Sequence, residues 1–486
     1  GGKVKAVFLR PLEAEDKEVG LRTALLAEAA DGLGRKFKVD PLAFLLLPRA
    51  TFSYWVSEGI RSSFAQITPF DTEIRSALSG GKTLDDFRWV RAAWELHGDS
   101  SGQWPGFAKG GRHSLFYADV YLRLDWRASA RALKAYLVEY RERRGWSPNW
   151  TAELHGAEHY LRPGLTWPRR TKSGISFRVM PAGCVFADKG PAAFVQSDRG
   201  PGLLSLLAMT TSRAFAAFVA LQLAAGDAVP GGGVAHSFEV GVIQRTPVPS
   251  LTSVDESILA GLSRRAWSLK RSLDTRTENS HAFCIPALLQ SPAGIIAGRA
   301  AAWADRVRTF DTELGAIQAE IDDRCFALYG INDDDRKAIT EGFGGSAATQ
   351  PNDEAAPAAE PDSTSASDDD SDDSDEFTVA DATGLTADLL SWSIGVAAGR
   401  FDVRLATGER ALPPEPDPFD PLPVCSPGML TGADGLPCAT PPSGYPIDFP
   451  QDGVLLDDPG HPRDLSASAR AVFDVVFGGD ADARWQ

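Results

Sequence analysis

Turn-forming residues interrupt the stretch from Tyr160 to Pro191 so often that a helix of ordinary length cannot form there. Proline fixes φ and removes a backbone donor, and glycine is the residue that tight turns favour. The chain must therefore cross this region as short strands joined by turns. The turn formers are Pro163, Gly164, Pro168, Gly174, Pro181, Gly183, Gly190 and Pro191.

Cations and one indole are concentrated in the same stretch. Ile175, Phe177 and Val179 alternate with Arg178, the period of a half-buried strand, which predicts that Arg178 faces solvent or a ligand. The pattern fits a nucleic-acid-binding surface, or a β-turn region whose arginines are merely solvated or paired with acids. The candidate DNA-binding residues here are Arg162, Trp167, Arg169, Arg170, Lys172, Arg178 and Lys189.

A second basic turn, Lys-Gly-Gly-Arg, occupies residues 109–112. Its two glycines would let the backbone approach a phosphate closely, although a simple hairpin turn has the same composition. Lys109 and Arg112 therefore join the candidate DNA-binding residues.

Two roles are expected among the arginines, because a guanidinium can read guanine bidentately or clamp a phosphate. Arg162 and Arg178 stand beside strands that could fix a base-reading geometry. Arg169 and Arg170 follow a proline in a turn and are expected to contact phosphates. Trp167 could stack on a base or could be an ordinary core residue.

The net charge of −16 does not exclude DNA binding, because the charge is unevenly distributed. Residues 351–376 contain 11 acids and no lysine or arginine, whereas residues 141–180 contain eight cations and three acids, a net of +5. A basic face can therefore exist on an acidic protein.

Several segments resemble the target-recognition region of PglX-type adenine-specific DNA methyltransferases, found in the BREX and DISARM anti-phage systems of bacteria. The segments that carry the resemblance are RPGLTWPRRT and PAGCVFADKGPAAF in the central stretch, WPGFAKGG at 104–111, FYAD at 116–119, AAFVALQLAAGD at 216–227, FEVGVIQRTPVPSL at 238–251 and AWSLKRSLDTRTENSHAF at 266–283. A weaker match occupies residues 399–430. The resemblance implies double-stranded DNA as a partner and N6-adenine methylation by a catalytic domain.

Catalytic motifs are not recognisable in the sequence. Asn-Pro does not occur, so the Asn-Pro-Pro-aromatic turn of adenine methyltransferases is absent, and neither Phe-Gly-Gly triplet follows a predicted strand. No nucleophile elbow, Walker loop or kinase signature is present. The histidines and the five cysteines are scattered, which predicts neither a metal site nor disulfides. We therefore expect no catalytic residues or cofactor here, and S-adenosylmethionine in a catalytic domain outside this chain.

An α+β fold in five parts is expected. The parts are a connector from an upstream catalytic domain at 1–84, a β-rich DNA target-recognition domain at 85–252, a helical hairpin at 253–341, a disordered acidic linker at 342–378 and a Pro-rich C-terminal module at 379–486. Apolar periodicity predicts helices at about 14–30, 128–144, 203–226 (a helical pair), 253 onward, 294–329, 385–398 and 464–477. Strands are predicted near 87–90, at 118–124, 238–248 and 401–405, and Ser253 as an N-cap with Glu256.

The resulting hypothesis is a DNA-recognition portion that chooses the site for a catalytic domain or subunit. A non-catalytic assembly subunit of a defence complex, which would bind other defence-system proteins, is the main alternative, and a DNA mimic or host-factor binder is a third. Since the longest apolar run, Ala214 to Gly226, is too short for a bilayer, we expect a cytoplasmic protein without membrane contact.

Overall fold

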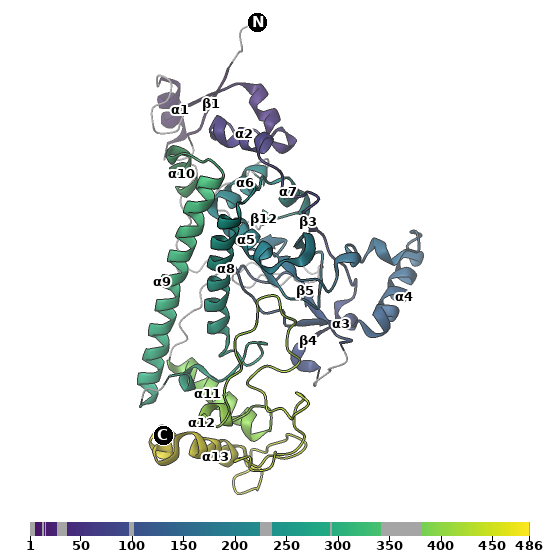
Figure 1. The fold of residues 1–486 in the computed structure, drawn as a ribbon, viewed down its shortest axis with the longest axis vertical. Helices are drawn as coiled ribbons and strands as arrows, with labels where there is room; N and C mark the ends of the chain where they lie inside the picture. Colours follow the sequence, from purple (N-terminus) through teal and green to yellow (C-terminus); the bar gives the residue numbers. More distant parts are fainter. Residues whose placement is uncertain are drawn as a thin grey trace.

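The computed structural model describes residues 5–11, 14, 16–26, 36–96, 102–223, 236–291, 294–341 and 382–485. The fold mixes helices with several small sheets, which confirms the α+β prediction (Figure 1). The predicted acidic linker, residues 342–378, lies outside the described residues.

Two four-stranded sheets form the centre of the molecule. The first has the order β10-β5-β6-β4 and the second the order β3-β11-β7-β9. The strands of the first are β10 (Cys184–Phe186), β5 (Gly106–Ala108), β6 (Leu122–Leu124) and β4 (Val90–Ala92), and those of the second are β3 (Arg75–Leu78), β11 (Ala192–Val195), β7 (Gly164–Thr166) and β9 (Arg178–Met180). Short strands joined by turns, as the spacing of proline and glycine predicts, thus make up the region from 160 to 195.

Helices cover the second sheet on one side of the molecule. In Figure 1 the long helices α8 (Ser253–Asp274) and α9 (Ile296–Leu328) lie side by side, and α4 (Arg127–Arg143) projects from the opposite side. The predicted helical pair is α5 (Gly200–Thr211) and α6 (Arg213–Leu223). The shorter helices are α3 (Asp86–Trp89), α7 (Val240–Arg245) and α10 (Asp333–Thr340).

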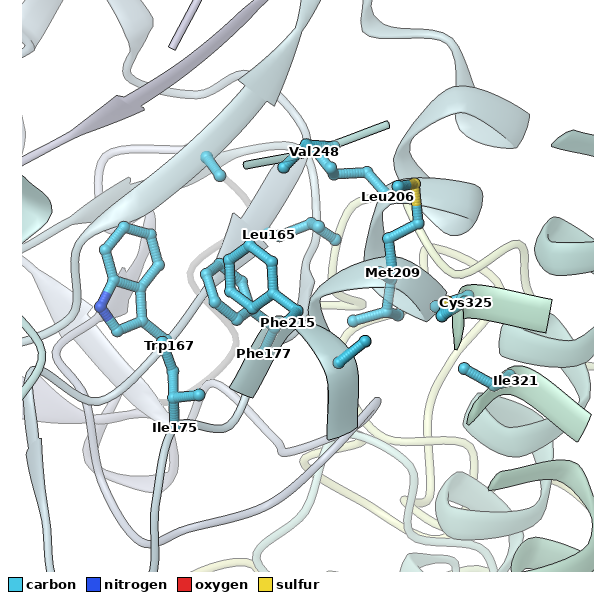
Figure 2. Close-up of a cluster of buried hydrophobic side chains, with 14 of the residues drawn as sticks. Leu165, Trp167, Ile175, Phe177, Leu206, Met209, Phe215, Val248, Ile321 and Cys325 are labelled. Carbon is cyan, nitrogen blue, oxygen red and sulfur yellow. The ribbon is translucent and has the colours of Figure 1, made fainter. Parts of the chain in front are cut away.

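The largest hydrophobic core lies between the second sheet and these helices. Figure 2 shows Trp167 and Phe177 beside Phe215 of α6, with Cys325 of α9 farther along the same core. The ring centroids of Trp167 and Phe177 are 4.8 Å apart, and Phe215 packs edge-on against Phe177. Residues from about 56 to 329, and Phe419, share this core, so it crosses the domain boundary that the sequence predicts at 252.

The two ends of the chain form smaller parts. Near the N-terminus are β1 (Ala6–Leu9), α1 (Lys17–Leu26), β2 (Lys36–Val39), the 3-10 turns Pro41–Leu46 and Pro48–Ala50, and α2 (Glu58–Gln66). The C-terminal part contains α11 (Ala382–Ala397), α12 (Arg404–Thr407), α13 (Leu465–Phe477) and α14 (Ala481–Trp485). Between α12 and α13 an irregular Pro-rich segment runs back over the sheets, where the Phe419 carbonyl accepts a hydrogen bond from the Ala182 N–H at 3.1 Å.

Most of the predicted long helices are confirmed. The helix predicted at 294–329 is α9, that at 385–398 is α11, and that at 464–477 is α13 with Asp464 as its N-cap. The N-cap predicted at Ser253 is wrong by one residue, because the Thr252 side chain accepts the Asp255 N–H.

The strand predicted at 238–248 is wrong. Val240–Arg245 forms α7 instead, and the adjacent residues Val242 and Ile243 are both buried. An extended strand would place two neighbouring side chains on opposite faces, whereas a helical turn can bury both.

Two further strand predictions fail for a local reason. At 401–405 the buried Asp402 carboxylate accepts the Arg404 N–H and turns the chain into α12. At 87–90 the carboxylate of Asp85 caps the short helix α3, so only Val90 enters a strand. Of the strand predicted at 118–124, the sheet contains Leu122–Leu124 alone.

Within the described ranges, no single helix is long and apolar enough to span a membrane. The bent pair α5 and α6 passes the same test only when its helices are taken together, and nine of the twelve residues of α5 are buried in the protein.

Candidate nucleic-acid interface

Strand pairing brings together three segments of the sequence that each contain a lysine or arginine. Strands β5 and β10 are parallel, with Ala108 opposite Phe186, so the turns that follow them lie at the same edge. Strand β7 is antiparallel to β11, with Thr166 opposite Ala192, so the segment after β7 meets the turn before β11. We call the result the basic turn cluster, which consists of residues 109–112, 169–172 and 187–190.

Backbone contacts fix these segments against one another. Arg170 lies in the two-residue strand β8 (Arg170–Thr171), which pairs with His236–Ser237, and not in the turn that the sequence predicts. The Arg169 N–H donates to the Lys189 carbonyl at 2.9 Å, and the Ala187 N–H donates to the Ala108 carbonyl at 2.9 Å. A Cβ added at Gly110 would lie 2.6 Å from the Lys189 carbonyl oxygen, and φ at Gly110 is 87°. Only glycine fits there, because the position combines left-handed backbone with a close approach of two turns.

Arg178 supports the turn of residues 109–112 from inside the fold. It is only 5% exposed, and its guanidinium donates to the carbonyl of Arg112 at 2.8 Å and to the carbonyl of Gly110. The prediction that Arg178 faces solvent or a ligand is therefore wrong. Because both donors point to backbone carbonyls inside the fold, Arg178 positions the turn and is not available to read a base.

Trp167 and Arg162 also differ from the expected geometry. The Trp167 side chain is fully buried, and its Nε1–H donates to the Phe238 carbonyl at 3.0 Å, so Trp167 is a core residue and base stacking is excluded in this fold. Arg162 lies at the opposite end of the β7–β11 pair, where its Nε and Nη2 bind Asp198 at 3.0 and 2.7 Å. This bidentate ion pair separates Arg162 from the basic turn cluster.

The remaining candidates stay at the surface of the cluster. Arg112 and Arg170 are exposed, and neither forms an ion pair within the part of the chain that the structure describes. Lys172 and Lys189 are exposed as well. Lys109 pairs with Asp86, and Arg169 lies 3.4 Å from Asp188 and 3.8 Å from Glu239. Among the described residues, the six cations outnumber the three acids that pair with Lys109 and Arg169, an excess of positive charge that suits a polyanion.

A buried polar network that joins residues 119–123 to the segment after α8 was not predicted from the sequence. His281 Nδ1 lies 2.9 Å from Asp119 Oδ1, and its Nε2 lies 2.7 Å from Arg123 Nη2. A neutral ring that donates to Asp119 and accepts from Arg123 satisfies both contacts. Since both ring nitrogens are occupied, the geometry indicates a structural role and not a catalytic base. Asp119 and His281 belong to two of the segments that resemble PglX-type proteins, FYAD and TENSHAF. The residue types in these segments do not by themselves predict that the two side chains pair.

This network lines a cavity of about 320 Å³ beneath the Pro-rich segment. Burial raises the pKa of the neighbouring Tyr117 phenol, which donates to Asp274 at 2.7 Å. Among the described residues, no three His, Cys, Asp or Glu side chains are arranged to hold a metal ion.

Comparisons with known proteins give two distant relatives, while no family model matches the chain. The chain is 22% identical over 175 residues to the adenine-specific methyltransferase BrxX of Escherichia coli O9:H4 (strain HS), an alignment that covers 35% of this chain and 13% of that protein. It is 21% identical over 352 residues to the adenine-specific methyltransferase PglX of Lacticaseibacillus casei (strain Zhang), covering 67% of this chain and 27% of that protein. The chain thus aligns with about a quarter or less of each relative's length, and it is a distant relative of proteins named as adenine-specific methyltransferases.

Proposed function

We propose that this chain is the DNA-recognition portion of a site-specific adenine (N6) DNA methyltransferase of a bacterial anti-phage defence system. The observation that carries the proposal is the basic turn cluster, in which three segments distant in sequence present exposed cations on one rigid edge. Double-stranded DNA is the ligand that this arrangement suits, because phosphates lie at regular intervals along a duplex.

The residues divide into contacts and supports. Arg112 and Arg170 are the first candidates for direct contact, since their guanidinium groups are exposed and unpaired among the described residues. Lys172 and Lys189 add charge at the same edge. Arg178 and Gly110 act through the backbone, because they hold the turn of residues 109–112 in place.

Catalysis would belong to a methyltransferase domain or subunit outside this chain, which would bind S-adenosylmethionine and transfer its methyl group in the cytoplasm. The distant relatives, which are much longer, support this division of labour.

A non-catalytic assembly subunit remains the second candidate, favoured by apolar side chains near the N-terminus. Leu45 is 70% exposed and Phe52 is 68% exposed, and both lie on the same short stretch as the exposed Leu42. Such a surface suits a protein neighbour. The two proposals make different predictions for DNA affinity.

The test is a fluorescence-anisotropy titration of a labelled random-sequence duplex at several salt concentrations. The variants are R112A, R170A and the double variant, and R308A on α9 is the control, because it removes the same charge from an exposed site far along the sequence. Each lost phosphate contact should reduce the slope of log K against log salt by about 0.9. If the double variant matches R308A in affinity and slope, the assembly function replaces the DNA-recognition function.

A further inference from the structure

One phenylalanine projects completely into solvent beside the basic turn cluster. Phe87 is 97% exposed, the highest value among the large apolar side chains of the described residues. It lies on α3, where the next residue but one, Trp89, is 3% exposed and anchors the helix in the core. A fully exposed phenyl ring lacks the stabilisation of about 2–3 kcal/mol that its burial would give. A surface position of this kind therefore calls for an explanation.

The short helix that carries Phe87 is held firmly. The Asp85 carboxylate accepts the Arg88 N–H at 3.2 Å, and the Phe87 carbonyl accepts a hydrogen bond from Arg91 Nη1 at 2.7 Å. The Arg88 guanidinium lies 4.7 Å from the Trp89 ring and 5.1 Å from the Tyr136 ring. The backbone position from which Phe87 projects is therefore fixed before any ligand arrives.

An ion pair connects this helix to the basic turn cluster. Asp86, the residue before Phe87, binds Lys109 at the start of the turn 109–112. Two exposed cations, Lys82 and Arg88, lie close to Phe87 in the sequence. Leu84, which is 38% exposed, lies on the same turn with a left-handed φ of 60°. Asp85 is the only acid of this turn without a cationic partner among the described residues, and its carboxylate is engaged in capping α3.

An exposed apolar side chain tied to a basic turn through the Asp86–Lys109 ion pair suits the chemistry of DNA better than that of a protein surface. Proteins that bend duplexes insert phenylalanine or leucine between adjacent base pairs while cations hold the backbone on either side. Unstacking one step costs a few kcal/mol and is least costly at flexible pyrimidine–purine steps such as TA.

We propose that Phe87, supported by Leu84, is a wedge that inserts between base pairs of the duplex bound by the basic turn cluster. The inference rests on the proposed function, because it requires that this edge binds DNA. The wedge would distort the duplex next to the recognised bases, and would favour sites in which a TA or CA step lies at the wedge position.

The experiment measures affinity and local unstacking separately. The probe is a duplex with TA steps that carries 2-aminopurine at those steps, and a matched A-tract duplex is the comparison. Wild-type protein should raise 2-aminopurine fluorescence on the TA duplex and bind it more tightly than the A-tract duplex. F87A should bind the TA duplex roughly ten-fold more weakly, in line with the effect of removing one base–aromatic contact, and should lose the fluorescence rise.

Two controls make the result specific. F87L keeps an apolar wedge and should retain most of the fluorescence change, whereas R170A should reduce the salt slope but keep the fluorescence change at saturation. F87A should leave the salt slope unchanged, since it removes no charge. Because Phe87 is exposed, its replacement should not impair folding.

The outcomes separate the two proposals. Duplex binding with an unchanged signal in F87A overturns the wedge and leaves DNA recognition intact, and it would point to a protein that covers Phe87. A wild-type protein that binds no duplex at low salt overturns DNA recognition and the wedge together.

Discussion

Arg178 Nη1 donates to the backbone carbonyl of Arg112 at 2.8 Å, and Nη2 of the same side chain donates to the carbonyl of Gly110. Strand β9 is thereby joined to the turn after β5 through a single buried guanidinium. The fork of an arginine reaches two carbonyls at once, which a point charge such as lysine cannot reproduce. The exposed position of the Arg112 side chain depends on this internal brace.

Replacing Arg178 should therefore destabilise the protein. We expect R178M to lower the free energy of unfolding by about 2–3 kcal/mol, because two carbonyls lose a charged donor. R178K should lie between the wild type and R178M. Urea denaturation followed by circular dichroism measures the effect, with R112A as a surface control that changes stability by about 0.5 kcal/mol or less. Equal stability of R178M and R112A would contradict the bracing role.

Asp188 should weaken DNA binding in the wild-type protein. Its carboxylate lies 3.4 Å from Arg169 Nη1 and neutralises part of the basic turn cluster. D188N should raise affinity for a random duplex and steepen the salt slope by up to about 0.9, because Arg169 becomes available to a phosphate. D305N on α9 makes the same charge change elsewhere and is the control. An identical response of the two variants would argue that only net charge matters.

The helices could be predicted from the sequence more reliably than the sheets. The stripe from Trp303 to Leu328 repeats over many turns, so local periodicity alone indicated α9 to within two residues at each end. The strands of the two central sheets have only three or four residues. Such short runs carry little periodicity, and their pairing depends on residues far away in the sequence. The helix α7 (Val240–Arg245) is just as short, so its periodicity cannot distinguish it from the strand that the sequence predicts there.

The composition of the candidate site was also more predictable than its geometry. The gathering of cations and turn formers indicated a basic edge, but which arginines reach its surface depends on strand register. Arg178 turns inward because β9 pairs with β7, placing Arg178 opposite Thr166. Arg162 meets Asp198 only because β11 folds back along β7. Phe87 is of a residue type that favours strands, but Asp85 caps the short helix α3 at this place, and Phe87 is exposed on that helix.

Trp167 should matter for stability and not for DNA contact. W167F removes the donor to the Phe238 carbonyl and leaves a small cavity, which together should cost about 1–3 kcal/mol. Affinity for a random duplex, measured per folded molecule by anisotropy, should be unchanged. The control is W94F, since Trp94 is 45% exposed and should tolerate the change. A W167F protein that is as stable as W94F yet binds DNA more weakly would restore Trp167 to the interface.

Cysteine reactivity should follow burial. Burial raises the pKa of the Cys184 and Cys325 thiols to about 12, and both side chains are almost inaccessible. Since the thiolate is the reactive form, Ellman's reagent should modify these two only after unfolding. Cys284, Cys425 and Cys438 are partly exposed and should react first. Mass spectrometry of briefly labelled native protein identifies the sites, and rapid labelling of Cys184 would contradict the packing of β10 against β5.

The ion cluster around Asp402 should make stability depend on pH in the acid range. The Asp402 side chain is fully buried, and its carboxylate accepts hydrogen bonds from Arg404 at 2.9 and 2.8 Å and from Arg410 at 2.8 Å. Burial alone would raise the pKa of this carboxyl, but the hydrogen bonds from Arg404 and Arg410 outweigh burial and the pKa is lowered.

A lowered pKa in the folded state means that the ionised carboxylate stabilises the protein above its unfolded pKa, about 3.9, and that this contribution is lost as the pH falls through the folded value. D402N should therefore lower the free energy of unfolding by about 2 kcal/mol at neutral pH, since two charged donors lose an ionised acceptor. The difference from wild type should shrink at acid pH, where the wild-type carboxyl is protonated as well. D457N, at an exposed position, should show neither effect in the same urea titrations. A difference between D402N and wild type that is constant from neutral to acid pH would show that the charge of Asp402 does not contribute to stability.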